Sequence, residues 1–305
     1  MKRFSMMILI LLLGMGSTAN AATITDAAGR VIEVNKPFTR IISLYGAHTE
    51  NLFSLGLDAE IIGVSKSEDY PPRALQKEVF DYRGDAEKFL AAKPDLVLVR
   101  PMIERSKGGL VAKLIEAGIT VVSLQPVNID QTFSYWRDLG VLTGREQAAE
   151  AMVQTFKAGL AEVANRVQTI PATARKRVYF ESIHRKMKTF APTSMTIFAL
   201  TTAGGINVAD DAERVRSTNI AAYGKEQILA KSAEIDVFLA QKGAMNRITR
   251  DTVINEPGFA AIKAVQEGQV FLVNERLVSR PTMRLLDGIR EIGAILYPDT
   301  FAAAK

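Results

Sequence analysis

The chain has 305 residues, of which 48% are apolar, so it is long enough for two domains that each bury a hydrophobic core. The net charge of +5 is a mild excess, and no run of Lys and Arg of the kind that binds nucleic acid is present. There is no cysteine, which excludes disulfide bonds, thiolate zinc sites and iron–sulfur clusters.

The first 21 residues have the features of a secretory signal peptide. Lys2 and Arg3 precede an apolar run at 6–16, and Ala19 and Ala21 are the small residues of a cleavage site. The run is too short to cross a hydrocarbon layer of about 30 Å, which takes about 20 apolar residues. No cysteine follows it, so the lipid-anchor site of a bacterial lipoprotein is missing. We expect cleavage after about Ala21 and a mature protein that is free in the periplasm and not embedded in a membrane.

Short apolar strands alternate with helices in the first half of the chain. Such alternation is typical of a parallel sheet with helices on both faces. It predicts an N-terminal α/β lobe at 22–142. The predicted elements are a strand at 39–44, a helix at 48–57, a strand at 59–65, a strand at 94–100, a helix at 108–118 and a strand at 119–125.

One long helix, predicted at 143–168, interrupts this alternation. Its apolar residues Met152, Phe156 and Leu160 recur at helical spacing and form one stripe. The alternation of strands and helices then restarts, which predicts a second α/β lobe at 169–305. The sequence thus indicates two lobes, one on each side of a helix.

Both lobes contain a similar helix–strand motif. The first reads "EKFLAAKPDLVLV" at 87–99, and the second reads "EQILAKSAEIDVFLA" at 226–240. In each motif a glutamate, Glu87 or Glu226, is followed three residues later by Leu and Ala, and then by Asp and an apolar run. The second copy has two extra residues between Ala and Asp, and a chance similarity of common helix–turn–strand units is the alternative explanation.

The order of the motifs resembles that of periplasmic substrate-binding proteins of ABC importers, in the class that binds cobalamin, ferric siderophores and haem. The resemblance spans essentially all of the chain after the signal peptide. It implies two Rossmann-like lobes with parallel sheets, joined by one long backbone α-helix, with the ligand cleft between the lobes. The segments that carry it are "RIISLYGAHTENLFSLGLDAEIIGVS", "DYPP", "EKFLAAKPDLVLV", "LIEAGITVVSLQP", "KEQILAKSAEIDVFLA" and "SRPTMRLLDGIREIGAIL".

The resemblance also assigns a role to the repeated glutamates. It implies that Glu87 and Glu226 dock onto arginines of the membrane permease, one on each permease subunit. A carboxylate near the start of a helix is favoured by the helix dipole, and when exposed it can pair with an arginine of a partner. A simple preference for acidic residues in the first turn is the alternative. The protein would then be a monomeric carrier and not an enzyme.

Basic and aromatic residues recur where the predicted strands end, which is where ligands bind in doubly wound sheets. Arginine pairs with carboxylates and phosphates, and aromatic faces cover bulky organic groups. Together they predict an anionic, partly aromatic or macrocyclic ligand, such as a ferric chelate with free carboxylates. For any one arginine, a solvated loop position is the alternative. The candidate ligand-binding residues are Tyr45, His48, Tyr70, Tyr82, Arg83, Arg100, Arg185, Arg247, Arg280 and Arg284.

The resemblance leaves the ligand open. Tyr70 and Tyr82 match aromatic contacts of the cobalamin binders, whereas Arg100 stands where those proteins have Trp, which favours a charged chelate. For haem, Tyr82 or Tyr45 would be the axial ligand, with His184 opposite. Two histidines without cysteine give no cluster for a bare metal ion. We therefore expect no metal site and no cofactor.

An exported α/β hydrolase is the alternative from another functional class. The sequence has neither the G-x-S-x-G nucleophile motif nor a G-x-x-x-x-G-K-(S/T) phosphate loop. A sensor or adaptor with the same fold is a third possibility. We therefore expect the solute-binding component of an ABC importer that captures an anionic iron chelate of the ferric siderophore type, with cobalamin, another corrinoid or haem as the alternative ligand.

Overall fold

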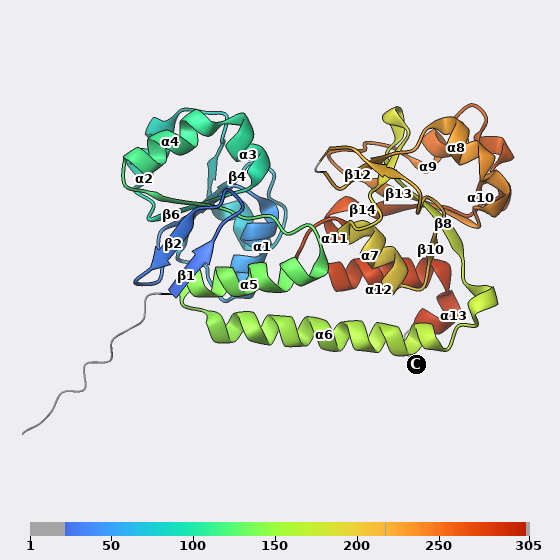
Figure 1. The fold of residues 1–305 in the computed structure, drawn as a ribbon, viewed down its shortest axis with the longest axis horizontal. Helices are drawn as coiled ribbons and strands as arrows, with labels where there is room; N and C mark the ends of the chain where they lie inside the picture. Colours follow the sequence, from blue (N-terminus) through green and yellow to red (C-terminus); the bar gives the residue numbers. More distant parts are fainter. Residues whose placement is uncertain (1–21, 217, 303–305) are drawn as a thin grey trace, which may run out of the picture.

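The structure is a computed structural model that describes residues 22–216 and 218–302. The predicted signal peptide, residues 1–21, lies outside the described residues. The described chain forms two α/β lobes that stand next to each other, and one long helix, α6 (Glu146–Gln168), runs beneath both of them (Figure 1). Within this part of the chain, no helix combines the length and the apolar character needed to cross a bilayer.

The N-terminal lobe contains a small hairpin and a five-stranded parallel sheet. Its strands are β1 (Ala22–Thr25), β2 (Val31–Val34), β3 (Ile41–Ser43), β4 (Ile61–Ser65), β5 (Glu78–Phe80), β6 (Leu96–Val99) and β7 (Thr120–Ser123). β1 and β2 pair antiparallel, and the sheet has the order β5-β4-β3-β6-β7. The central strands β3 and β6 are buried over their whole length, as continuous apolar runs in a covered parallel sheet require.

Helices cover both faces of this sheet. They are α1 (Gly46–Ser54), α2 (Ala86–Ala92), α3 (Pro101–Ser106) and α4 (Gly108–Glu116). Side chains of β3 alternate between two apolar cores, because Ile41 contributes to one cluster and Ile42 to the other. Because the five strands of the sheet run parallel, their carboxyl ends all lie at one edge, where the following loops begin.

Two antiparallel helices pack against each other here, and only the second of them, α6, runs from one lobe to the other, over nearly the range expected for the helix at 143–168. The first, α5 (Ile129–Thr143), ends at Gly144, which adopts a left-handed conformation with φ of 64°. Glycine adopts this conformation without the steric cost that other residues have, so it ends the helix and reverses the chain. The linking helix α6 therefore begins at Glu146, and α5 is an element that the sequence analysis did not identify.

The C-terminal lobe has a seven-stranded mixed sheet of order β11-β12-β9-β8-β13-β14, with β10 beside β8. Its strands are β8 (Arg177–Ile183), β9 (Lys188–Phe190), β10 (Ile206–Asn207), β11 (Glu213–Arg214), β12 (Ile220–Ala222), β13 (Val237–Lys242) and β14 (Val270–Asn274). The pairs of β8 with β10, of β8 with β13, and of β13 with β14 are parallel, but β9, β11 and β12 pair antiparallel.

The expectation of two α/β lobes is confirmed, but the second sheet is parallel only in part. β8 and β9 are joined by residues 184–187 alone, and a parallel crossover needs about a dozen residues. The helices of this lobe are α7 (Met195–Thr202), α8 (Lys225–Ala230), α9 (Arg250–Ile254), α10 (Lys263–Gln266), α11 (Glu275–Val278), α12 (Leu285–Leu296) and α13 (Pro298–Phe301).

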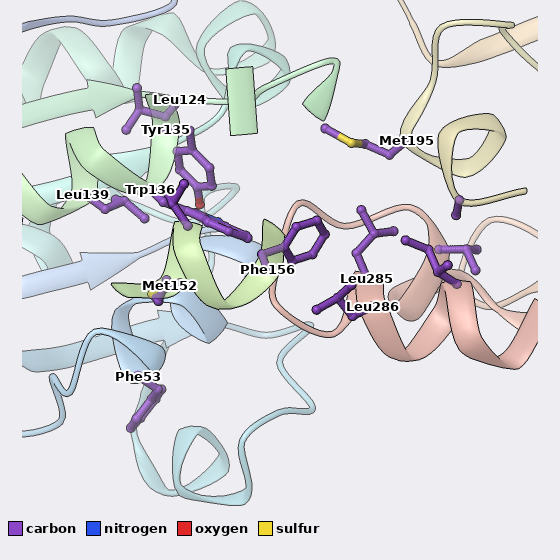
Figure 2. Packing of buried hydrophobic residues seen from close by; sticks show 14 of the residues in the cluster. Phe53, Leu124, Tyr135, Trp136, Leu139, Met152, Phe156, Met195, Leu285 and Leu286 are labelled. Atoms are coloured by element: carbon purple, nitrogen blue, oxygen red, sulfur yellow. The ribbon is translucent and has the colours of Figure 1, made fainter. Parts of the chain in front are cut away.

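One apolar core continues from lobe to lobe. Trp136 of α5 and Phe156 of α6 have ring centroids 5.3 Å apart, and both belong to the same buried cluster as Leu285 and Leu286 of α12 (Figure 2). Helix α6 approaches α12 closely, since a Cβ atom at Gly159 would lie 2.6 Å from a methyl group of Leu286. The lobes are therefore held together by packed side chains as well as by the connecting helix.

Candidate ligand-binding cleft and docking carboxylates

The carboxyl ends of the N-terminal strands place several predicted residues at one edge of the sheet. Tyr45 comes shortly after β3, Tyr70 is in the loop after β4, Tyr82 is in the loop after β5, and Arg100 directly follows β6. Since these strands are parallel, the four residues emerge on the same side. This edge is the position at which a doubly wound sheet binds its ligand.

Tyr45 and Arg100 form a pair at this edge. The guanidinium carbon of Arg100 lies 4.8 Å from the centroid of the Tyr45 ring, within the range of a cation–π contact. Burial raises the pKa of the Tyr45 hydroxyl, which keeps the phenol protonated at neutral pH. The pair therefore offers a neutral aromatic face beside a permanent positive charge.

The structure places His48 behind this pair and not on the cleft surface. The side chain is fully buried, its Nδ1 lies 2.7 Å from the Tyr135 hydroxyl, and its Nε2 lies 3.0 Å from the Val99 carbonyl oxygen. Burial lowers the pKa of His48 to about 4, so the ring is neutral at physiological pH. With Nε2 donating to Val99 and Nδ1 accepting from Tyr135, neither nitrogen is left for a ligand. The predicted ligand contact of His48 does not fit this position; the ring supports Tyr45 instead, edge to face at 5.1 Å.

Carboxylates of the N-terminal lobe meet arginines of the C-terminal lobe in what we call the interlobe charge cluster. Glu50 of α1 accepts from Arg280 at 2.6 Å and from Arg284 at 3.4 Å. Asp69, in the loop after β4, pairs with Arg280 at 3.1 Å and with Arg276 at 2.6 Å. Sequence reasoning identified Arg280 and Arg284 but missed both acidic partners and Arg276.

Burial governs the electrostatics of this cluster. The Glu50 side chain is only 2% exposed, and desolvation raises its pKa although Arg280 opposes the rise. Arg280 lies directly against helix α1, because a Cβ atom at Gly46 would be 2.7 Å from a guanidinium nitrogen. The absence of a side chain at Gly46 is therefore what lets the arginine reach Glu50.

Glu68, another acidic residue that the sequence analysis did not select, lies beside the cluster. Its Oε1 accepts from the Ser65 hydroxyl at 2.6 Å, and its buried Oε2 has no hydrogen-bond partner among the described residues. Burial raises the pKa of Glu68 to about 7, so its charge changes near neutral pH.

Two pockets adjoin the cluster. One, of about 530 Å³, includes Tyr70, whose ring lies 4.2 Å from the Arg284 guanidinium carbon, and thus brings together both lobes and α6. The other, of about 610 Å³, lies where β13 and β14 end and includes Arg247 and Arg276. Because Arg284 lines one pocket and Arg276 the other, the cluster connects them. The residues of the first pocket are Tyr70, Thr155, Ala158, Gly159, Glu162, Met283, Arg284, Leu286, Asp287 and Arg290.

The remaining predicted residues are not members of the interlobe charge cluster. Tyr82 and Arg83 contact each other at 5.2 Å, and the Arg83 side chain is exposed. Arg185, at the tip of the β8–β9 hairpin, is exposed, as is Arg247. None of these three arginines forms an ion pair within residues 22–216 and 218–302. His184 is buried with a carboxylate near each ring nitrogen, so neither nitrogen is free to bind a haem iron opposite Tyr45 or Tyr82. Over the same ranges, no group of three or more metal-binding side chains is found.

The two repeated glutamates occupy equivalent positions. Glu87 is the second residue of α2 and Glu226 is the second residue of α8, and both side chains are exposed. In Figure 1 both helices lie on the side of the molecule away from α6. Neither carboxylate pairs with a cation among the residues described, so each is available to an arginine outside the chain.

Comparisons with known proteins agree with this architecture. The chain is 27% identical over 287 residues to YvrC, an uncharacterised ABC transporter substrate-binding lipoprotein of Bacillus subtilis, with 92% of this chain and 86% of the relative covered. It is 30% identical over 275 residues to the vitamin B12-binding protein of Vibrio campbellii, covering 85% of this chain and 89% of the relative.

A solved structure of a possible iron-binding (periplasmic solute-binding) protein from Staphylococcus epidermidis is also similar. It matches with a TM-score of 0.73 and 27% identity, over 86% of this chain and 100% of that one. The family described as periplasmic binding protein matches residues 41–277, which is most of the chain. The chain belongs to the periplasmic binding protein family.

Proposed function

We propose that the protein is the periplasmic solute-binding component of an ABC importer and that it captures an anionic iron chelate of the ferric siderophore type. Its relatives are substrate-binding transport proteins, and we extend the absence of an enzymatic activity to this chain. The observation that carries the choice of ligand is the repeated pairing of a tyrosine from a loop of the N-terminal sheet with an arginine. Tyr45 with Arg100 and Tyr70 with Arg284 each combine a flat aromatic face with a positive charge.

Arg284 is the cluster arginine best placed to bind the ligand. Its distance to Glu50 is 3.4 Å, whereas Arg280 binds the same carboxylate at 2.6 Å, so Arg284 is the more weakly held of the two. It also lines the pocket that Tyr70 shares. A carboxylate of the chelate would take the free donors of Arg284, and the Tyr70 ring would cover the organic part. Arg280 would keep Glu50 neutralised.

Titration with candidate ligands tests this choice. Ferric citrate, a ferric hydroxamate, cyanocobalamin and haemin are added to the mature protein, and binding is measured by calorimetry and by visible absorption. We expect the anionic ferric chelate to bind most tightly and to lose affinity in Arg100→Gln and Arg284→Gln. Arg137→Gln, which removes an exposed arginine of α5, is the matched control. Tight binding that neither cleft variant weakens would contradict the proposal.

A corrinoid ligand is the second candidate, because the relative from Vibrio campbellii is named a vitamin B12-binding protein. Tyr70 and Tyr82 would then cover the corrin ring, and Arg100 would contact a polar side group rather than a carboxylate. The absorption spectrum of protein purified from its own periplasm separates the candidates, since a corrin spectrum, a charge-transfer band and a Soret band differ. A bound corrin would replace the iron chelate as the ligand.

We further propose that Glu87 and Glu226 dock the loaded protein onto arginines of the permease. Both are exposed first-turn residues of short helices, one in each lobe. The double variant Glu87→Ala, Glu226→Ala should bind ligand as the wild type does and fail in uptake. The matched control is Glu116→Ala, Glu267→Ala, which changes two exposed glutamates outside the motif. Wild-type uptake by the docking variant would refute this role.

We propose that the mature protein is released into the periplasm. The relative from Bacillus subtilis is named a lipoprotein, whereas this sequence contains no cysteine to carry a lipid. Osmotic-shock fractionation and N-terminal sequencing of the released protein test the proposal. A first residue near Ala22 in the soluble fraction is expected, and retention in the membrane fraction would contradict it.

A further inference from the structure

Four charged or titratable side chains of the C-terminal lobe form a connected group that the ligand cleft does not use, here called the His184 network. His184 Nδ1 lies 2.8 Å from Oε2 of Glu181, which is fully buried, and His184 Nε2 lies 3.2 Å from Oε2 of Glu256. The other oxygen of Glu256 pairs with Lys225. Burying these charges is costly unless they pair with one another, so the network holds its members in fixed positions.

One end of the network is at α8 (Lys225–Ala230), here called the docking helix of the C-terminal lobe because it carries Glu226. Lys225 is the first residue of α8 and precedes Glu226 directly. Its Nζ donates to the Pro257 carbonyl at 3.2 Å as well as pairing with Glu256, so it attaches the start of α8 to the segment 256–257. An isolated helix of this length is unstable in water, so the orientation of α8 depends on such tertiary contacts. The network is therefore one of the tertiary contacts that hold α8, together with the buried side chain of Ile228.

At its other end the network continues toward the cleft through buried amides. Asn246 accepts from the backbone N–H of His184 at 2.9 Å and donates to the Gln241 carbonyl at 2.9 Å. The Gln241 side chain accepts from the hydroxyl of Ser279 at 3.2 Å, and Ser279 precedes Arg280 of the interlobe charge cluster. The docking helix and the turn that carries Arg280 are thus joined by one set of polar contacts within the lobe.

The docking helix of the N-terminal lobe has no comparable arrangement. Lys88, next to Glu87, donates to the Val79 carbonyl at 2.6 Å and pairs with Glu78 at 3.1 Å. This pair is half exposed and includes no histidine. Helix α2 is therefore an internal reference for any effect of pH on α8.

We propose that the His184 network positions the docking helix α8, and that the protonation of His184 sets how firmly Glu226 is presented to the permease. The positioning residues are His184, Glu256 and Lys225. In this proposal they act through α8 and do not contact the ligand or the permease. The inference rests on the proposed docking function of Glu226.

The direction of the pH effect follows from the groups around the ring. Among the described residues, Glu181 and Glu256 face the two ring nitrogens and Lys225 faces Glu256, while the neutral Asn246 accepts from the backbone N–H of His184. Hydrogen bonding to Glu181 raises the pKa of His184 above its ordinary value of 6.5, with Glu256 adding to the rise. The imidazolium stabilises the network fully below pH 6.5, and this stabilisation is lost as the pH rises through the pKa of the folded state.

Hydrogen–deuterium exchange of the full mature protein measures the positioning without a partner. The exchange of α8 amides is compared with that of α2 amides, each corrected for the intrinsic effect of pH. We expect α8 to exchange roughly threefold to tenfold faster in Glu256→Gln and Lys225→Gln, as the loss of a charge-assisted hydrogen bond predicts. Wild-type α8 should lose protection as pH rises, and His184→Gln should remove that dependence. Glu150→Gln, which breaks an ion pair between α5 and α6, should change neither the exchange rate of α8 nor its pH dependence.

An uptake assay tests whether the positioning of α8 affects transport. It measures the uptake of radioactive ferric citrate and cyanocobalamin in cells that contain the native importer. We expect Lys225→Gln to reduce uptake less than Glu226→Ala does, with unchanged ligand affinity. If Glu226→Ala takes up ligand normally, the docking function fails and this inference fails with it. If Glu226→Ala is defective while α8 exchanges as in the wild type in both Glu256→Gln and Lys225→Gln, only the positioning inference is overturned. Lys225 is at the partly exposed end of the network, so its variant keeps the test valid if a buried substitution prevents folding.

Discussion

Replacing Arg280 by methionine tests the interlobe charge cluster directly. The substitution keeps most of the side-chain volume but removes the main partner of Glu50, whose side chain is 2% exposed. Breaking a buried ion pair from one side costs about 3–5 kcal/mol, because the remaining charge stays buried. Arg284 remains 3.4 Å from the second oxygen of Glu50 and offsets part of this cost. We therefore expect the free energy of unfolding to fall by about 2–4 kcal/mol.

Urea unfolding at two pH values measures this loss. Without Arg280 the pKa of Glu50 rises further, so at about pH 5 more of the carboxyl is protonated and the penalty should be smaller than at about pH 8. Arg137→Met is the matched control, because its partner Glu150 is exposed, and it should leave stability unchanged. The double variant Glu50→Gln, Arg280→Met should be more stable than Arg280→Met alone. Equal losses in Arg280→Met and in the control would refute the reasoning.

Three further predictions concern single side chains. Gly46→Ala should lower the free energy of unfolding by about 1–3 kcal/mol, since the new methyl group meets the Arg280 guanidinium, and thermal unfolding measures the change. Arg284→Ala should weaken ligand binding by about 1–3 kcal/mol in a calorimetric titration, and unchanged affinity would remove it from the site. The chain has two histidines, so their ring signals are easily resolved by NMR. The pKa of His184 should lie above the ordinary histidine value of 6.5, whereas His48 should stay neutral down to about pH 4.

The fold was predictable where local pattern determines structure. Continuous apolar runs such as 96–99 indicate buried parallel strands, and the structure has β6 there with all residues buried. The antiparallel strand β9 was not predicted, because its turn uses Met187 in a left-handed conformation with φ of 45°, a conformation that is uncommon for methionine. The break between α5 and α6 did have a signal, since Gly144 followed by Arg145 and Glu146 is a helix end followed by a helix start.

The cleft was predictable only in part for a different reason. Arginines at strand ends can be recognised from the sequence, but their partners are distant along the chain. Glu50 lies within a helix with no motif to mark it, and it meets Arg280 from the other lobe. Pairing therefore changes the interpretation of the arginines, since Arg280 is neutralised by the protein and Arg100 forms no ion pair within the described residues. Sequence reasoning counted both as equally available to a ligand.

The contacts between the lobes limit the movements that could contribute to ligand selectivity. Opening the lobes by rotation would separate Arg280 of the C-terminal lobe from Glu50 of the N-terminal lobe, at a cost of several kcal/mol in ion pairing. Binding of a small chelate supplies free energy of similar size, so a large opening would consume most of the affinity. Selection must therefore come from side chains that move without separating the lobes. Tyr70, which is 42% exposed, and the weakly paired Arg284 meet this condition, and ligand specificity should follow changes at these two residues more than changes at Arg280.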